Sequence, residues 1–196
     1  MSALSFEHAL IVVDVQQGFD APSWGRRSNS RCEENIAALI TAWRQQGWPV
    51  VYVRHDSVLP ASALSPRGGG NALKPALAGE PDLLIVKHTN SAFYGTPDLH
   101  AFLQDRHLRG VAVCGFTTNH CCESTARMAG NLGYSTKFIL DATCTFDRRA
   151  PDGEWIPAEE LMRVTATNLN EEFAVVLLTH DVLDALAPER REVTSQ

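Results

Sequence analysis

Three residues with reactive side chains follow three different apolar segments of this sequence. Asp14 lies in ALIVVDV, Lys87 ends LLIVK, and Cys121 comes shortly after GVAVCG. A carboxylate among apolar residues is costly unless it is paired, and a lysine ammonium is its natural partner. A carboxylate beside a thiol also offers a base that can remove the thiol proton. Together the three residues predict a nucleophilic cysteine. Taken singly, Asp14 and Lys87 are equally well explained by a structural ion pair.

The two adjacent cysteines face different directions on a helix predicted over residues 119–131. Cys122 falls on one stripe with Ala126 and Ala129, which indicates a packed position. Cys121 lies about 100° further around the axis. It is in the first turn, where free backbone amides favour an anion and lower the pKa of a thiol. Cys121 is therefore the predicted nucleophile.

His120 and Asp14 are the two candidates for the base that removes the proton of this thiol. His120 is the nearest histidine in sequence, but on a helix it faces away from Cys121, so we assign it to the substrate pocket or to a structural role. Asp14 is the better candidate for the base. Lys87 would then hold the charge and the orientation of the carboxylate.

Apolar segments alternate with helical ones along the chain. The predicted strands cover residues 9–15, 50–55, 83–88, 110–115, 136–140 and 173–178, and the predicted helices cover residues 32–46, 98–105, 119–131, 157–169 and 180–186. Strands that are apolar on both faces are typical of a buried parallel sheet. The alternation predicts an α/β fold, a three-layer sandwich formed by a single domain over residues 1–196. Ligands bind such sheets at the carboxyl ends of the strands, which is where the three reactive residues lie.

Two further features accompany this pattern. Thr118 or Asn119 is expected to cap the helix that carries the cysteines. The connection over residues 56–82 is long and rich in Pro, Gly, Ser and Ala. A connection of this length is usually a lid, a binding loop or an oligomer contact, and a variable insertion without a role is the alternative.

Composition and missing motifs exclude several classes of function. The net charge is −6 and no cluster of Lys and Arg appears, which argues against nucleic-acid binding. The fold is expected to be Rossmann-like without the dinucleotide motif, since no G-x-G-x-x-G is present, and Walker, H-E-x-x-H and G-x-S-x-G motifs are missing too. No segment is long enough to span a membrane, and the first residues lack the features of a signal peptide. Five cysteines without framework spacing indicate a reducing compartment, so we expect a cytoplasmic protein.

The motifs resemble those of one known family. IVVDVQQGF at residues 11–19, K-x-x-x-S-A-F at 87–93 and G-x-x-T-N-x-C-x-E-S-T-A-R-M-A at 115–129 are similar to the isochorismatase-like cysteine hydrolases, and DAT at 141–143 also fits. The resemblance runs through nearly the whole chain in the expected order. The family includes nicotinamidase, N-carbamoylsarcosine amidase, ureidoacrylate amidohydrolase, biuret and streptothricin hydrolases, and isochorismatase.

The resemblance implies a catalytic triad of Asp14, Lys87 and Cys121 on a six-stranded parallel sheet of order 3-2-1-4-5-6. It also implies a cis peptide bond between Phe116 and Thr117, with the amides of Thr117 and Cys121 forming an oxyanion hole. The implied reaction is hydrolysis of a C–N bond in a small amide, ureide or lactam through a thioester. Relatives are commonly homo-oligomers, so a dimer or tetramer is expected.

Departures from the family pattern bear on the metal and the substrate. Nicotinamidases carry an Asp-x-His metal motif after the second strand, and here that region reads VRHDSVLP. His55, Asp56 and His88 lie near the same edge, but three such residues without a ligand motif are more often hydrogen-bonded or solvated, so we expect neither metal nor cofactor. The aromatic residues near strand ends that are expected to finish the pocket are Phe19, Trp24, Phe93, His120 and Phe146. For Trp24 and Phe146 a place in the core is the alternative.

Two other functions remain as competing hypotheses. An isochorismatase-type vinyl-ether hydrolase is the alternative enzyme, although family members of that type lack the cysteine at this position. A binding or assembly protein that keeps the fold without catalysis is the third. It predicts that Cys121 reacts with iodoacetamide no faster than the other four thiols.

Overall fold

The computed structural model describes residues 7–187, so the predicted domain over 1–196 extends beyond this part at both ends. The predicted fold class is confirmed, because six parallel strands form one sheet in the order β3-β2-β1-β4-β5-β8. Its strands are β1 (His8–Val13), β2 (Val50–His55), β3 (Leu83–Lys87), β4 (Gly110–Phe116), β5 (Ser135–Cys144) and β8 (Val175–Leu177). The helices are α1 (Cys32–Gln46), α2 (Leu99–Asp105), α3 (Glu123–Asn131), α4 (Ala158–Leu169) and α5 (Thr179–Leu186).

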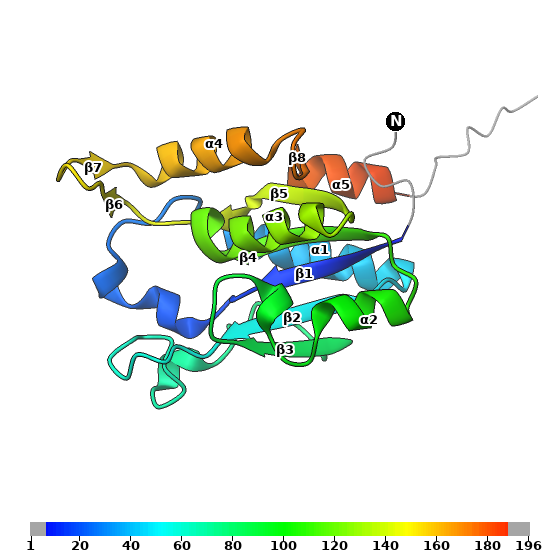
Figure 1. The fold of residues 1–196 in the computed structure, drawn as a ribbon, viewed down its shortest axis with the longest axis horizontal. Coiled ribbons are helices and arrows are strands. Elements are labelled where there is room, and N and C mark those ends of the chain that lie inside the picture. Colours follow the sequence, from blue (N-terminus) through cyan, green and yellow to red (C-terminus); the bar gives the residue numbers. More distant parts are fainter. Residues whose placement is uncertain (1–6, 188–196) are drawn as a thin grey trace, which may run out of the picture.

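Helices cover both faces of the sheet and bury the central strands completely (Figure 1). Along β1, Leu10 and Val12 pack toward α1 and α5, while Ala9 and Ile11 pack toward α2 and α3. Successive side chains of a strand point to opposite faces, so a strand covered on both sides must be apolar throughout. The uninterrupted apolar runs of the sequence are the direct consequence.

The fifth strand is longer than predicted, and a small hairpin follows it. Instead of ending at residue 140, β5 continues to Cys144 after a register shift opposite Val113 and Gly115 of β4. The strands β6 (Arg148–Arg149) and β7 (Trp155–Ile156) then form an antiparallel hairpin that the sequence did not reveal. Two-residue strands are too short to show a period, which explains why it was missed.

The long connection over residues 56–82 is tied to the sheet edge by amide side chains. Gln16 accepts the His55 N–H at 2.8 Å and donates to the carbonyls of His55 at 3.1 Å and Asn71 at 2.8 Å. Asn71 donates in turn to the Leu64 carbonyl at 3.0 Å. These buried contacts extend the backbone pairing of β1 and β2 into the connection, which is therefore an anchored part of the fold and not a loose insertion.

A close backbone approach at Gly18 fastens the same connection. A Cβ atom at Gly18 would lie 2.3 Å from the carbonyl oxygen of Ala63. We expect Gly18→Ala to lower the free energy of unfolding by about 1–3 kcal/mol, because backbone must move to admit the methyl group. Chemical denaturation measures this loss.

Gly69→Ala is the matched control, since nothing lies within 4 Å of the Cβ position there and its φ is not positive. It should leave stability unchanged or raise it by up to about 1 kcal/mol. Equal losses in the two variants would contradict the packing argument.

Within residues 7–187, no helix has the length and apolar character needed to cross a membrane.

Candidate active site

The carboxyl ends of β1 and β3 bring Asp14 and Lys87 together. Asp14 is the residue after β1 and has a φ of 51°, a left-handed conformation that aspartate adopts more readily than most residues. Its N–H donates to the Val53 carbonyl at 2.9 Å, which fixes the turn. Lys87 closes β3, and its Nζ donates to Asp14 Oδ2 at 2.7 Å. Both side chains are fully buried.

Lys87 Nζ is the centre of the cluster. Besides Asp14 it contacts Cys121 Sγ at 3.3 Å, His55 Nδ1 at 3.2 Å and the Thr89 carbonyl at 3.0 Å. An ammonium has three protons, so four such neighbours share them. The ammonium therefore lies between the carboxylate and the thiol and can stabilise negative charge on either.

The Cys121 thiol lies close to the Asp14 carboxylate, one oxygen of which is unused. Within the described residues, the buried Oδ1 atom of Asp14 has no hydrogen-bond partner. A carboxylate oxygen of Asp14, the Cys121 sulfur and a ring nitrogen of His55 all lie within 4.8 Å of one another. Cys121 Sγ donates to Asn90 Oδ1 at 3.7 Å. The arrangement leaves an acceptor next to the thiol, while Cys122 is fully buried in the core.

The chain around the cysteines differs from the predicted helix start. Residues Thr118–Cys122 form a π-helical turn before α3, with Thr117 at the N-cap position and no side-chain capping bond. Thr118 instead donates to the Thr143 hydroxyl at 2.8 Å, and Asn119 accepts from Thr145 at 2.5 Å. The predicted cap by Thr118 or Asn119 is therefore wrong, because Thr143 of β5 and Thr145 just after it bind these two side chains instead.

The same turn shapes the backbone that faces the thiol. The Thr117 carbonyl accepts the N–H groups of His120 and Cys122, each at 3.2 Å, and the amide of Cys121 is not among its donors in the described part of the chain. The peptide bond between Phe116 and Thr117 is cis. Gly115 precedes it with a φ of 123°, and a Cβ there would lie 2.0 Å from the Val13 carbonyl oxygen, so only glycine fits.

Burial dominates the electrostatics of the site. It raises the pKa of the Cys121 thiol, and the Asp14 charge adds to this effect. The expectation of a thiol with a lowered pKa is thus wrong, because the effect of desolvation on this pKa is larger than the opposite effect expected from the N-terminus of the helix. Burial also raises the pKa of Asp14 despite Lys87. Burial by itself would lower the pKa of Lys87, but Asp14 and Cys121 outweigh it and raise that pKa. A protonated thiol of this kind needs a neighbouring base.

A model of the Isochorismatase domain matches residues 8–170. The chain belongs to the isochorismatase family. It is 38% identical to the uncharacterized isochorismatase family protein YrdC of Bacillus subtilis over 90% of this chain and 94% of that protein. It is 30% identical to nicotinamidase 3 of Arabidopsis thaliana, over 86% of this chain and 83% of that protein.

The fold agrees with a crystal structure from the same family. An isochorismatase-family protein from Chromobacterium violaceum superposes with a TM-score of 0.89 at 38% identity, covering 95% of this chain and 96% of that one. The resemblance drawn from the motifs is therefore confirmed.

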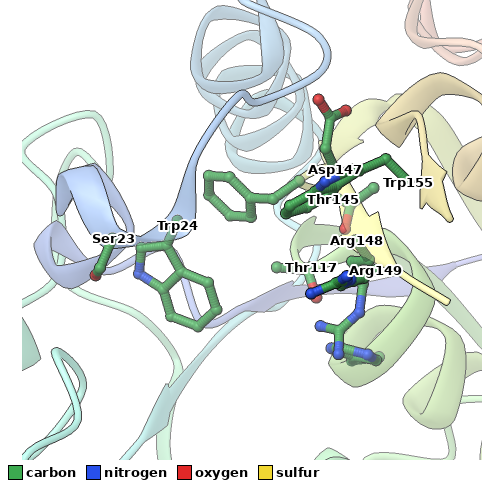
Figure 2. Close-up of a pocket in the computed structure, with 10 residues that line it drawn as sticks. Ser23, Trp24, Thr117, Thr145, Asp147, Arg148, Arg149 and Trp155 are labelled. Carbon is green, nitrogen blue, oxygen red and sulfur yellow. The ribbon is translucent and has the colours of Figure 1, made fainter. Parts of the chain in front are cut away.

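A cavity of about 310 Å³ adjoins the cluster of this isochorismatase-family hydrolase. Thr117 and His120, which are four residues and one residue before Cys121 in sequence, both line it, whereas Cys121 is not among its lining residues. Figure 2 shows Trp24 on one side of the cavity and Arg148, Arg149 and Trp155 of the β6–β7 hairpin on the other, with Thr117 between them. The other lining residues are Ser23, Thr145, Phe146 and Asp147.

Three of the five predicted pocket residues line this cavity, namely Trp24, His120 and Phe146. Phe19 lies behind them, 5% exposed, and stacks on Phe116 at a ring distance of 5.2 Å. Phe93 stacks on Tyr134 at 6.1 Å among the residues that pack against the other face of the sheet. The two phenylalanines are outside this cavity because packing, not proximity to a strand end, decides which way a ring points.

A salt bridge fastens the hairpin that forms one wall. Arg26 bonds both oxygens of Asp147, at 2.8 and 2.6 Å, and both oxygens of Glu159, at 2.8 and 2.7 Å. Arg26 thereby joins the segment that carries Trp24 to the hairpin and to α4. Two bidentate contacts hold a geometry better than an isolated ion pair does.

The three residues considered as metal ligands do not converge. The Asp56 carboxylate accepts from Arg54 at 2.8 Å and from Asn71 at 3.0 Å, and His88 Nδ1 lies 2.7 Å from the Asp56 carbonyl. His55 instead lies with Asp14 and Cys121. These three residues form the one cluster of potential metal ligands among the described residues. The Lys87 ammonium already lies among these three groups.

Sequence reasoning missed several parts of the site. It left His55 without a role beside Lys87 and overlooked Asn90, although His55 ends β2 and Asn90 follows β3 at the same sheet edge. It also missed the arginine pair of the hairpin. DAT, by contrast, has a structural role, because Asp141 Oδ1 accepts from the N–H and the hydroxyl of Thr179, the first residue of α5, each at 2.7 Å.

Proposed function

We propose that the protein is a cysteine amidohydrolase that cleaves a C–N bond in a small amide, ureide or lactam, with Asp14, Lys87 and Cys121 as its catalytic triad. The observation that carries the proposal is the position of Lys87 Nζ, 2.7 Å from Asp14 and 3.3 Å from Cys121, beside a cavity of small-molecule size. The similarity to nicotinamidase 3, whose name denotes an amidase, supports the reaction type.

In the first half of the reaction, Asp14 Oδ1 takes the Cys121 proton and the thiolate attacks the substrate carbonyl carbon. We propose that the amides of Thr117 and Cys121 hold the oxyanion. Asp14 then gives its proton to the leaving amine as the C–N bond breaks, which leaves a thioester on Cys121.

In the second half, Asp14 removes a proton from water, and the hydroxide attacks the thioester. The acid is released, and the proton returns to Cys121 through Asp14. Lys87 stays protonated throughout and stabilises whichever of the two partners carries the negative charge.

The test is a screen of small amides and ureides for release of ammonia or amine, with Cys121→Ala as the blank. We expect at least one compound to be cleaved by the native protein and by no preparation of the variant. Cleavage that persists in the variant would contradict the proposal.

The pH profile gives a second test, because burial shifts the groups that must be in the correct protonation state. Asp14 must be ionised to act as the base, and its pKa lies above the ordinary 3.8. Activity should therefore fall on the acid side at a higher pH than an exposed carboxyl would give. The Cys121 pKa is raised above 9.0, so the loss on the alkaline side should begin above that value.

Measurement of kcat/KM from pH 4 to 10 records the acid limb and shows whether activity persists up to pH 9.0. An acid limb at the ordinary carboxyl value, or an alkaline limb well below 9.0, would contradict these assignments.

A further inference from the structure

The cavity beside Cys121 carries an uncompensated positive charge. Among its lining residues Asp147 is the only acid. Arg26 binds both oxygens of Asp147 and both oxygens of Glu159, so these two acids against Arg26, Arg148 and Arg149 leave one positive charge in excess. Asp147 also accepts the Ala158 N–H at 2.8 Å. Arg149 Nε donates to the Gly153 carbonyl at 3.0 Å, which fixes that side chain to its own hairpin. Arg148 has no ion-pair partner anywhere in residues 7–187.

The remaining titratable group on the wall does not change this balance. His120 is half-buried, and burial together with the Arg148 charge lowers its pKa, which favours the neutral ring at pH 7. The catalytic pair of Asp14 and Lys87 cancels internally. The chain as a whole has a charge of −6, so the positive wall is a local feature and not part of a general basic surface.

The opposite wall is apolar and fixed. The indole N–H of Trp24 donates to the Gly18 carbonyl at 2.9 Å, so it is not available to a ligand. The Trp24 ring stacks on Phe146 at a ring distance of 5.3 Å and packs against Phe19 in a tilted arrangement at 5.0 Å. This wall offers an aromatic surface to an apolar or planar group.

We propose that the substrate carries a carboxylate, and that this carboxylate binds Arg148 while the body of the molecule packs on Trp24 and Phe146. The inference rests on the proposed function, because it takes the cavity as the place where the scissile amide approaches Cys121. A guanidinium pairs with a carboxylate through two parallel hydrogen bonds, which gives orientation as well as attraction. The substrate class is thus a small amide with an anionic group and an apolar or planar body.

Two matched pairs of amides test the substrate class, namely 4-carbamoylbenzoate against 4-methylbenzamide and succinamate against butanamide. Each compound is added at increasing concentration while iodoacetamide alkylates Cys121, and the labelling of the Cys121 peptide is followed by mass spectrometry. We expect the carboxylate member of at least one pair to protect the thiol at about tenfold lower concentration than its neutral partner. This readout requires binding and not turnover.

Arg148→Gln should remove this advantage. Arg163→Gln should keep it, because Arg163 is an exposed arginine of α4 that does not line the cavity. Equal protection by both members of each pair in the native protein, or an advantage that survives Arg148→Gln, would overturn the inference.

Ammonia release from the same compounds separates the two proposals. If Cys121→Ala still cleaves an amide, the proposed function fails whatever the protection data show. If cleavage depends on Cys121 but the neutral amides are cleaved as well as the anionic ones, the function stands and the carboxylate inference fails.

Discussion

Replacing Cys121 by alanine is expected to lower kcat for amide hydrolysis by about 10⁴-fold or more, because the variant has no atom that can form the thioester. The loss should appear in kcat and in kcat/KM alike, since the substrate still binds in the cavity. Ammonia release under saturating substrate measures the first, and initial rates at low substrate measure the second. A stable fold is expected, because Cys121 lies at the edge of its core cluster and is 9% exposed.

Cys122→Ala is the matched control for this experiment. Cys122 is the neighbouring thiol and is fully buried, so the substitution removes one core sulfur without touching the cluster around Lys87. It should cost some stability and leave a substantial part of the activity. If Cys122→Ala abolishes hydrolysis and Cys121→Ala does not, the assignment of the nucleophile is reversed.

Cys121→Ser distinguishes the amidohydrolase from an ether hydrolase. Serine has a much higher pKa than a thiol, so a buried carboxylate cannot activate it equally well, and amide cleavage should be lost. A vinyl-ether hydrolase that works without the thiol would keep most of its activity. Trapping the thioester provides a direct check, because the mass of the native protein should rise by that of the acyl group during turnover.

Removing Lys87 has the second large effect, and it falls on stability as well as on activity. Lys87→Met leaves the fully buried Asp14 carboxylate without its ion-pair partner. Breaking a buried pair by deleting one member costs about 3–5 kcal/mol, because the remaining charge stays desolvated. We expect a loss of this size in the free energy of unfolding at pH 7, measured in urea, together with loss of hydrolysis.

The pH dependence of this loss follows from Asp14. Burial raises the pKa of this carboxyl even with Lys87 present, and without the ammonium it must rise further. A group whose pKa is raised on folding favours the folded state below its unfolded pKa and disfavours it as pH rises through the folded pKa. The penalty of Lys87→Met should therefore be largest at neutral pH and shrink as the pH is lowered and Asp14 becomes neutral.

The double variant Asp14→Asn/Lys87→Met supplies the control. It removes both charges, so it should recover part of the stability lost in Lys87→Met while remaining inactive. A double variant no more stable than Lys87→Met would show that packing, and not the buried charge, is responsible for the loss.

Much of the fold follows from the chain because its pattern is local and repetitive. A strand buried on both faces must be apolar throughout, so β1, β2 and β4 can each be recognised from an apolar run of a few residues. Helix α1 begins and ends where its sequence predicts, with Gly47 in the left-handed conformation at its end. The features that escaped prediction are the extension of β5 and the β6–β7 hairpin. Both depend on contacts between residues far apart in sequence: the extension pairs with Gly115 and Phe116 of β4, and Arg26 binds Asp147 beside the hairpin.

The candidate active site, like the fold, has features that follow from the sequence and features that depend on tertiary packing. The sequence by itself determined which residues come to one sheet edge, because Asp14 and Lys87 end parallel strands and Cys121 follows a third. It also separated Cys121 from Cys122 by helical direction. Only the tertiary structure decided the state of the thiol, since burial depends on everything packed around it and here raises a pKa that the local helix start would lower. The tertiary structure likewise decided which aromatic rings line the cavity and placed Arg148 on its wall, because side-chain direction is fixed by packing partners that no local pattern records.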